Sequence, residues 1–126
     1  MRIIILGSNG QLGLCLKDQL STTNHEVIFS SREHIDITNF EESKKMISDI
    51  DPDVIINASA YTAVDKAEDD KEDANLVNHL APANLGNICL QLGCWLIHIS
   101  TDYVFDGKSN TPYYEDSPTN PQGVYG

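Results

Sequence analysis

The chain has 126 residues, 40% of them hydrophobic, and a formal net charge of -11 at pH 7. A chain of this length removes roughly two-thirds of its unfolded surface from water, which is enough for one globular domain with a core. The negative charge repels nucleic-acid backbones, and the apolar run 3–6 is far too short for a signal peptide or a membrane span. The three cysteines have no metal-ligand spacing. We therefore expect a cytoplasmic protein with no metal site, no nucleic-acid partner and no membrane partner.

The pattern of apolar residues predicts alternating strands and helices. Short apolar runs bounded by polar residues or glycine are typical of buried parallel strands, and they lie at 3–6, 27–29, 54–56 and 95–99. The first helix is expected to begin near Gly10. The residues of this helix that are spaced to face the sheet are Leu12, Cys15, Leu16 and Leu20. A third helical region extends from about 68 to 92, where Pro82 starts or kinks a helix.

The second helix has the clearest boundaries. Thr38 and Glu41 fit a capping box, and Asp51-Pro52 ends the helix. Its buried face is predicted from the spacing of Phe40, Ser43, Ile47 and Ile50.

A glycine-rich turn joins the first strand to the first helix. Gly7, Gly10 and Gly13 have the G-x-x-G-x-x-G spacing of short-chain dehydrogenases. In such a turn the missing side chains allow a tight bend, a close approach of a pyrophosphate to the backbone and close packing of the helix. Because the motif directly follows an apolar strand, its position favours dinucleotide binding over a glycine turn without a ligand.

These elements predict the N-terminal half of an α/β fold, a Rossmann-type doubly wound parallel sheet with strand order 3-2-1-4. The complete sheet of such a domain has more strands than the four predicted here. We therefore expect residues 1–126 to be an incomplete NAD(P)-binding domain, with the substrate-binding part beyond residue 126.

Two further segments are expected along the dinucleotide. After the second strand, Ser31-Arg32 replaces the acidic residue that would hold the ribose hydroxyls, which favours NADPH over NADH. An exposed loop arginine is the alternative interpretation of Arg32. Asp36-Ile37 fits the adenine, with a turn-forming or capping aspartate as the alternative. The small residues of 57–60 fit a strand end crossed by a dinucleotide, with packing as the alternative. The candidate cofactor-binding residues are Gly7, Asn9, Gly10, Gln11, Leu12, Gly13, Ser31, Arg32, Asp36, Ile37, Asn57, Ala58, Ser59, Ala60 and Tyr61.

Three motifs together resemble the dTDP-4-dehydrorhamnose reductase family of extended short-chain dehydrogenases/reductases. They are the glycine motif at 7–13, NASAYTAVDKAE at 57–68 and STDYVFDG at 100–107. The resemblance covers the whole chain. It implies the NAD(P)H-dependent reduction of the 4-keto group of dTDP-4-dehydro-6-deoxy-L-mannose to dTDP-L-rhamnose, a step in polysaccharide biosynthesis. It also implies that this chain by itself is inactive.

The same resemblance implies the roles of the catalytic residues. Thr101 corresponds to the catalytic hydroxyl of the family, and Tyr125 to the tyrosine of its Tyr-x-x-x-Lys motif, whose lysine would fall three residues beyond Gly126. Tyr125 would donate a proton to the ketone oxygen while Thr101 hydrogen-bonds the same oxygen. Capping by Thr101 and packing by Tyr125 are the alternatives. The candidate substrate-binding residues are Asp102, Tyr103, Val104 and Phe105.

Cys15 departs from the family pattern. Some members have a glutamate there that contributes to a magnesium-bridged dimer, and a thiol is a poor ligand for magnesium, so we expect no magnesium and leave a homodimer open. Two other functions stay open: a non-catalytic dinucleotide-binding subunit like the regulatory subunit of methionine adenosyltransferase, and another nucleotide-sugar epimerase or dehydratase. Retention of Thr101 and Tyr125 favours catalysis, and Tyr103 stands where the dehydratase usually has an acidic residue.

Overall fold

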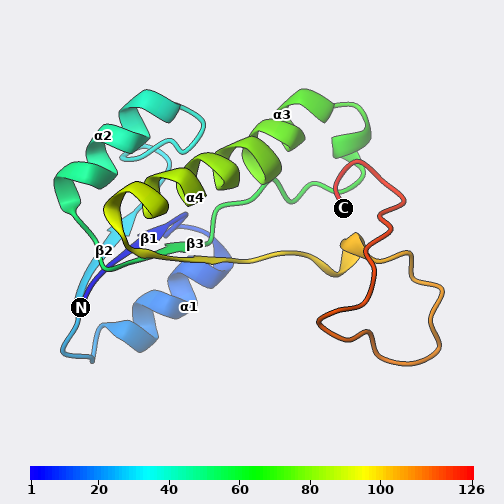
Figure 1. The fold of residues 1–126 in the computed structure, drawn as a ribbon, viewed down its shortest axis with the longest axis horizontal. Coiled ribbons are helices and arrows are strands. Elements are labelled where there is room, and N and C mark those ends of the chain that lie inside the picture. Colours follow the sequence, from blue (N-terminus) through cyan, green and yellow to red (C-terminus); the bar gives the residue numbers. More distant parts are fainter.

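The structure is a computed structural model that describes residues 1–126, and its centre is a parallel four-stranded sheet (Figure 1). The strands are β1 (Arg2–Leu6), β2 (Glu26–Ser30), β3 (Val54–Asn57) and β4 (Trp95–His98). The helices are α1 (Gln11–Leu20), α2 (Phe40–Ile50), α3 (Lys71–Asn75) and α4 (Ala81–Leu92). Shorter helical segments are η1 (Lys66–Glu68), the π-helix η2 (Leu76–Leu80) and η3 (Asp102–Val104). The predicted α/β fold with a parallel sheet is confirmed.

The order of strands in the sheet is β2-β1-β3-β4, so the predicted order 3-2-1-4 is wrong. β3 pairs directly with β1, because α2 leads the chain from β2 back across β1 on the face that also carries α4. Ile55 and Ile56 place apolar side chains on both faces of the sheet, which suits a central strand between β1 and β4. The chain proceeds in opposite directions from β1 and from β3. Such a reversal is where open α/β sheets bind their ligands.

Successive strand residues alternate between the two faces of the sheet and supply two layers of core. The larger layer joins the sheet to α2 and α4 and includes Ile4, Leu6, Ile47, Ile55, Leu85 and Ile88. The smaller layer joins the sheet to α1 and includes Ile3, Ile5 and Val54, with Leu16 and Leu20 packed against them. Figure 1 shows α1 on one side of the sheet, with α2 and α4 on the other. Both faces of β1 are therefore covered by helices, which explains why its apolar residues form a continuous run and do not alternate with polar ones.

α1 only partly follows its prediction. Leu16 and Leu20 pack toward the sheet, whereas Leu12 and Cys15 are exposed. Leu12 lies in the first turn of the helix, beyond the ends of the strands, where it lines a pocket instead of the core. The predicted apolar stripe of α1 is therefore too wide at its N-terminal end.

α2 begins at a different cap from the one predicted. Asn39 is the N-cap residue: its side-chain oxygen accepts the backbone N–H of Glu42 over 3.4 Å, and its amide donates to the Glu42 carboxylate over 2.7 Å. Thr38 instead donates its hydroxyl to Asp36 over 2.6 Å. The capping pair is thus shifted by one residue. The helix ends at Asp51, whose φ of 52° is left-handed.

The third helical region consists of η1 followed, from Lys71 to Leu92, by one continuous helical run in which α3, the π-helix η2 and α4 follow one another directly. Pro82, in the first turn of α4, lies inside this run directly after the π-helical turn, and Leu80 and Ala81 before it already have right-handed helical backbone angles. The predicted start of a helix at Pro82 is therefore wrong. No helix of the chain has the length and apolarity needed to cross a membrane. After β4 the chain forms a long loop away from the sheet, and its end returns beside the segment that contains η1 (Figure 1).

Candidate functional site

The carboxyl ends of β1 and β3 meet at the point where the strand order reverses. Gly7, with φ of 79°, follows β1, and a Cβ on it would lie 2.7 Å from the backbone nitrogen of Ser59 and 2.8 Å from the carbonyl carbon of Ala58. A side chain is therefore impossible there for both conformational and steric reasons. The contact holds the glycine loop against the segment that follows β3.

The two other glycines of the loop have different surroundings. A Cβ on Gly13 would lie 2.5 Å from the Gly7 carbonyl oxygen and 2.6 Å from the Ser8 Cα, so Gly13 lets α1 pack closely on the loop. A Cβ on Gly10 would meet one atom, the Gly7 oxygen, at 3.4 Å. Gly10 has an ordinary φ of -77°. Neither packing nor backbone conformation requires a glycine at position 10, and the free space beside it faces a groove.

α1 begins at this groove without a cap. Gly10 has no side chain to accept a hydrogen bond, and the first turn of α1 contains no acidic residue. By contrast, α2 is capped by Asn39 and has Glu41 and Glu42 in its first turn. The N–H groups and the positive dipole end of α1 are thus available to an anion in the groove.

Two pockets share the floor of this groove. We call the one of about 370 Å³ the Arg32 pocket and the one of about 540 Å³ the Tyr125 pocket. The residues that line both are Gly10, Ala58, Ser59 and Ala60. The pockets are therefore the two ends of one groove that crosses the carboxyl ends of β1 and β3.

The Arg32 pocket holds the charged residues predicted after β2. Arg32 Nε donates to the Asp36 carboxylate over 3.2 Å, and this carboxylate also accepts the N–H and the hydroxyl of Thr38 over 2.9 and 2.6 Å. Burial by itself raises the pKa of Asp36, but the hydrogen bonds from Thr38 and Arg32 outweigh it and hold the pKa below its usual value. Asp36 is therefore a turn-forming carboxylate, and it also forms an ion pair with Arg32, whose side chain is 78% exposed.

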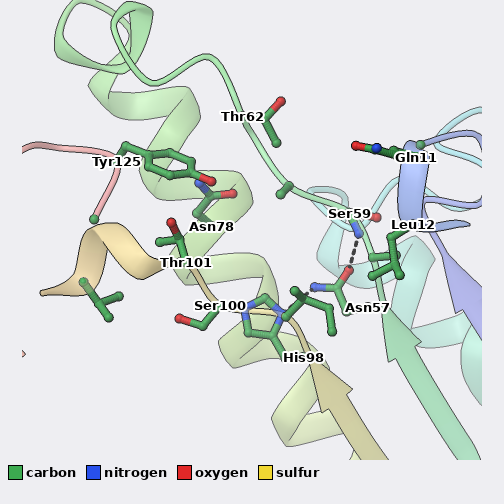
Figure 2. A pocket seen from close by; sticks show the side chains of 16 residues that line it. Gln11, Leu12, Asn57, Ser59, Thr62, Asn78, His98, Ser100, Thr101 and Tyr125 are labelled. Carbon is green, nitrogen blue, oxygen red and sulfur yellow. Dashed lines mark hydrogen bonds between the residues drawn. The ribbon is translucent and has the colours of Figure 1, made fainter. Parts of the chain in front are cut away.

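Asn57 organises the floor of the Tyr125 pocket. It is 1% exposed, and its side-chain oxygen accepts the backbone N–H of Ser59 over 3.1 Å, which fixes the orientation of the amide. The amide nitrogen then faces Nδ1 of His98 at 3.1 Å, so Nδ1 accepts and is unprotonated. Burial lowers the pKa of His98, which also favours the unprotonated form of the ring. Figure 2 shows this chain of hydrogen bonds from Ser59 to His98.

The two predicted catalytic residues, Thr101 and Tyr125, lie across the Tyr125 pocket from the glycine loop. Figure 2 shows Thr101, Tyr125 and Asn78 on one side, with Gln11 and Leu12 on the other. The Thr101 hydroxyl also caps η3 by accepting the N–H of Tyr103 over 3.2 Å. The ring of Tyr125 packs edge to face on Tyr103, with 5.5 Å between centroids. Thr101 thus caps a helix and Tyr125 packs on another ring, as the alternative interpretations state, and both residues also line the pocket.

The model of the family described as "RmlD substrate binding domain" matches residues 1–126, the whole chain. The chain belongs to this RmlD family. A dTDP-4-dehydrorhamnose reductase of Mycolicibacterium smegmatis is 42% identical over an alignment of 126 positions, which covers 99% of this chain and 38% of that protein. The chain therefore spans well under half the length of this relative.

Solved structures of dTDP-4-dehydrorhamnose reductases share the fold closely. A dTDP-4-dehydrorhamnose reductase of Clostridium acetobutylicum is 42% identical with a TM-score of 0.97, over 99% of this chain and 45% of that one. The Bacillus anthracis reductase, solved in complex with NADP, is 35% identical with a TM-score of 0.95, over 98% of this chain and 44% of that one.

Most predicted site residues of this RmlD family member line the groove. The Arg32 pocket is lined by Gly7, Asn9, Gly10, Ser31, Arg32, Asp36, Ile37, Ala58, Ser59, Ala60 and Tyr61. The Tyr125 pocket is lined by Gln11, Leu12, Asn57, Thr101, Val104 and Tyr125, besides the shared floor. Four predicted residues line neither pocket: Gly13, Asp102, Tyr103 and Phe105. Gly13 packs against the loop, and Phe105 stacks on Tyr113 with 4.2 Å between ring centroids.

Sequence reasoning assigned no site role to Asn78, which lines the Tyr125 pocket from the π-helix η2. Its side chain makes two hydrogen bonds to the backbone of Tyr61, accepting its N–H over 2.8 Å and donating to its carbonyl over 2.9 Å. π-Helical turns are frequent at functional sites, but no sequence pattern announces them. Other lining residues to which the sequence gave no site role are Glu33, Ile35, Thr38, Thr62, Val77, Ile99, Ser100 and Gly126.

Proposed function

We propose that these 126 residues are the cofactor-binding part of a longer NAD(P)H-dependent reductase, whose substrate-binding part follows residue 126. Its reaction is the reduction of the 4-keto group of dTDP-4-dehydro-6-deoxy-L-mannose to dTDP-L-rhamnose, in the cytoplasm. The observation that carries this proposal is the single groove, which leads from Arg32 across the glycine loop to Thr101 and Tyr125. The names of the relatives support the substrate, and the NADP complex of the Bacillus anthracis relative supports the cofactor.

The residues of the groove fit a dinucleotide. The space beside Gly10 is left open by the protein, and the uncapped start of α1 offers N–H groups to a pyrophosphate. At one end, Ser31 and Arg32 supply a hydroxyl and a cation that suit the 2′-phosphate of NADPH, and Ile37 is an apolar neighbour for adenine. The fit favours NADPH over NADH, because no carboxylate directly follows β2 to hold free ribose hydroxyls.

At the other end, two hydroxyl groups can serve a ketone. When bound, the reduced nicotinamide supplies the hydride. Tyr125 donates its phenolic proton to the ketone oxygen, and the Thr101 hydroxyl hydrogen-bonds that oxygen as negative charge develops on it. The small residues Ala58 and Ala60 leave room along the floor, and Asn57 holds this floor to β4 through His98. These roles need a substrate-binding part that closes the open side of the pocket.

The test is oxidation of NADPH and NADH by the full-length gene product with dTDP-4-dehydro-6-deoxy-L-mannose. We expect turnover, with Tyr125→Phe lowering kcat at least about 100-fold and leaving the cofactor Kd within about twofold of wild type. Tyr114→Phe is the matched control, because Tyr114 is 71% exposed and lies outside the groove. Cofactor binding without turnover would refute the enzymatic proposal and favour a non-catalytic binding subunit.

A further inference from the structure

The loop that carries Tyr125 is bonded mainly to itself. Asp106 accepts hydrogen bonds from the N–H of Lys108, the hydroxyl of Tyr113 and the amide of Asn120, over 3.1, 3.0 and 3.3 Å. These bonds keep the pKa of Asp106 below its usual value, the backbone N–H of Lys108 having the largest effect. They shape the loop but do not attach it to the sheet. The placement of Tyr125 therefore depends on other contacts.

One hydrogen bond joins residues 105–126 to the part of the chain before Thr101. The backbone N–H of Val124 donates to Oε1 of Glu68 over 2.8 Å, across 56 residues of sequence. Val124 directly precedes Tyr125. Because the acceptor is a carboxylate, this bond is of the stronger, charge-assisted kind. Figure 1 shows the end of the chain lying beside the segment that contains η1.

Gly123 makes room for this contact. A Cβ on Gly123 would lie 3.0 Å from Oε1 of Glu68, closer than most real contacts. The carboxylate therefore approaches the backbone of 123–124 at a point where a side chain is absent. Glu68 and Gly123, which are far apart in the sequence, therefore both contribute to the contact with Val124.

The segment that contains Glu68 is attached to residues that follow β3. Its neighbour Ala67 is fully buried, and Lys66 forms an ion pair of 2.7 Å with Asp70. Asp70 also accepts the Tyr61 hydroxyl over 3.0 Å. The backbone of Tyr61 is fixed in turn by the two hydrogen bonds from Asn78. These contacts attach the segment 66–70, which contains Glu68, to Tyr61 and η2.

We propose that Glu68 is a positioning residue for Tyr125: its carboxylate holds the N–H of Val124 and so sets the phenol at the end of the groove opposite the glycine loop. This inference rests on the proposed function, since it concerns the proton donor of that reaction. Glu68 is exposed, and a single solvent-accessible hydrogen bond adds little to global stability. Its loss moves the phenol without unfolding the protein. A misplacement of about 1 Å can cost a reaction about 100-fold in rate.

The experiment uses the full-length gene product with four changes: Glu68→Ala, Glu68→Gln, Gly123→Ala and Glu72→Ala. Glu72 is the matched control, because it is an exposed carboxylate in the same acidic stretch of sequence, residues 68–73, and its side chain makes no hydrogen bond or ion pair. We expect Glu68→Ala to lower kcat about 10- to 100-fold, with unchanged Tm and a cofactor Kd within about twofold of wild type. Glu68→Gln keeps an acceptor oxygen and restores most of kcat, Gly123→Ala causes a smaller loss, and Glu72→Ala has no effect.

Two measurements separate positioning from a general structural role. In a Tyr125→Phe background, Glu68→Ala should cause no further loss of kcat, because the group that it positions is absent. Hydrogen exchange of the Val124 amide should accelerate in Glu68→Ala and not in Glu72→Ala. A full additional loss on top of Tyr125→Phe would overturn the positioning role. Unchanged Val124 exchange in Glu68→Ala would overturn the contact itself, whereas a wild-type protein without turnover would refute the proposed function.

Discussion

Gly10 and Gly13 belong to one motif but should respond to substitution in different ways. In Gly13→Ala the new Cβ meets the Gly7 oxygen at 2.5 Å and the Ser8 Cα and carbonyl carbon at 2.6 and 2.7 Å. All three are backbone atoms, which cannot rotate away, so the cost is near the upper end for overpacking, about 3 kcal/mol. The better helix propensity of alanine returns about 1 kcal/mol. The expected net loss is about 2 kcal/mol, which corresponds to a fall in Tm of about 4–8 °C.

In Gly10→Ala the Cβ meets a single atom at 3.4 Å, an ordinary contact, and projects toward the groove. The Tm should therefore stay within about 2 °C of wild type. The methyl group takes the space proposed for the pyrophosphate, and we expect the Kd for NADPH to rise at least 10-fold, or about 1.4 kcal/mol.

The assay pairs thermal unfolding by circular dichroism with NADPH titration by fluorescence, both on the full-length gene product and its two variants. The expected pattern is opposite in the two variants: Gly13→Ala loses stability, and Gly10→Ala loses affinity. An unchanged Kd in Gly10→Ala would refute the assignment of the space beside Gly10 to the cofactor. A Tm loss in Gly10→Ala as large as in Gly13→Ala would refute the steric reasoning.

Three other predictions concern stability, cofactor choice and pH. Gly86 lies inside α4, and a Cβ at this position would meet no atom within 4 Å. Gly86→Ala should therefore raise the free energy of unfolding by about 1 kcal/mol, as measured by chemical denaturation. A lower free energy of unfolding would show that the helix needs a glycine there. Arg32→Ala should weaken NADPH binding about 10-fold or more with little effect on NADH, and equal effects on both cofactors in titrations would exclude a 2′-phosphate contact. Burial lowers the pKa of His98 below its value in the unfolded chain, about 6.5. The stability that depends on neutral His98 is therefore fully present above that pH and is lost as the pH falls. His98→Gln should flatten the fall in Tm at low pH, and an unchanged pH profile of Tm would contradict this role of His98.

The cysteines offer a chemical check of the core. Burial and the neighbouring Cys94 thiol raise the pKa of Cys89 to about 12, whereas Cys15 is exposed. Because the folded pKa lies above the usual value of 9.0, the thiol form of Cys89 stabilises the fold below pH 9 and this stability is lost as pH rises toward 12. In the folded protein at pH 8, we expect an alkylating reagent to label Cys15 well before Cys89, as measured by mass spectrometry. Equal rates would contradict the burial of Cys89.

The sequence alone predicted the strands, the main helices and most of the residues that line the groove, because all of these depend on local patterns. The run 3–6, the glycine spacing of 7–13 and the apolar spacing of α2 give local signals that neighbouring residues reinforce. The carboxyl ends of parallel strands always meet at one edge, so the order of motifs along the chain is enough to predict Asn57 and Thr101 near the glycine loop. The residues that line the two pockets follow largely from that rule.

Tertiary packing decided what the local patterns could not. The position of β3 beside β1 depends on which face α2 covers, and an apolar strand has no feature that names its neighbour. The exposure of Leu12 depends on where α1 lies relative to the ends of the strands. The π-helical turn that carries Asn78 is joined to Tyr61 by two hydrogen bonds, and Glu68 is joined to Val124 by one. Such isolated contacts leave no periodic trace in the sequence. A sequence records which residues are suited to a core or a turn, and only the folded chain decides which of them meet.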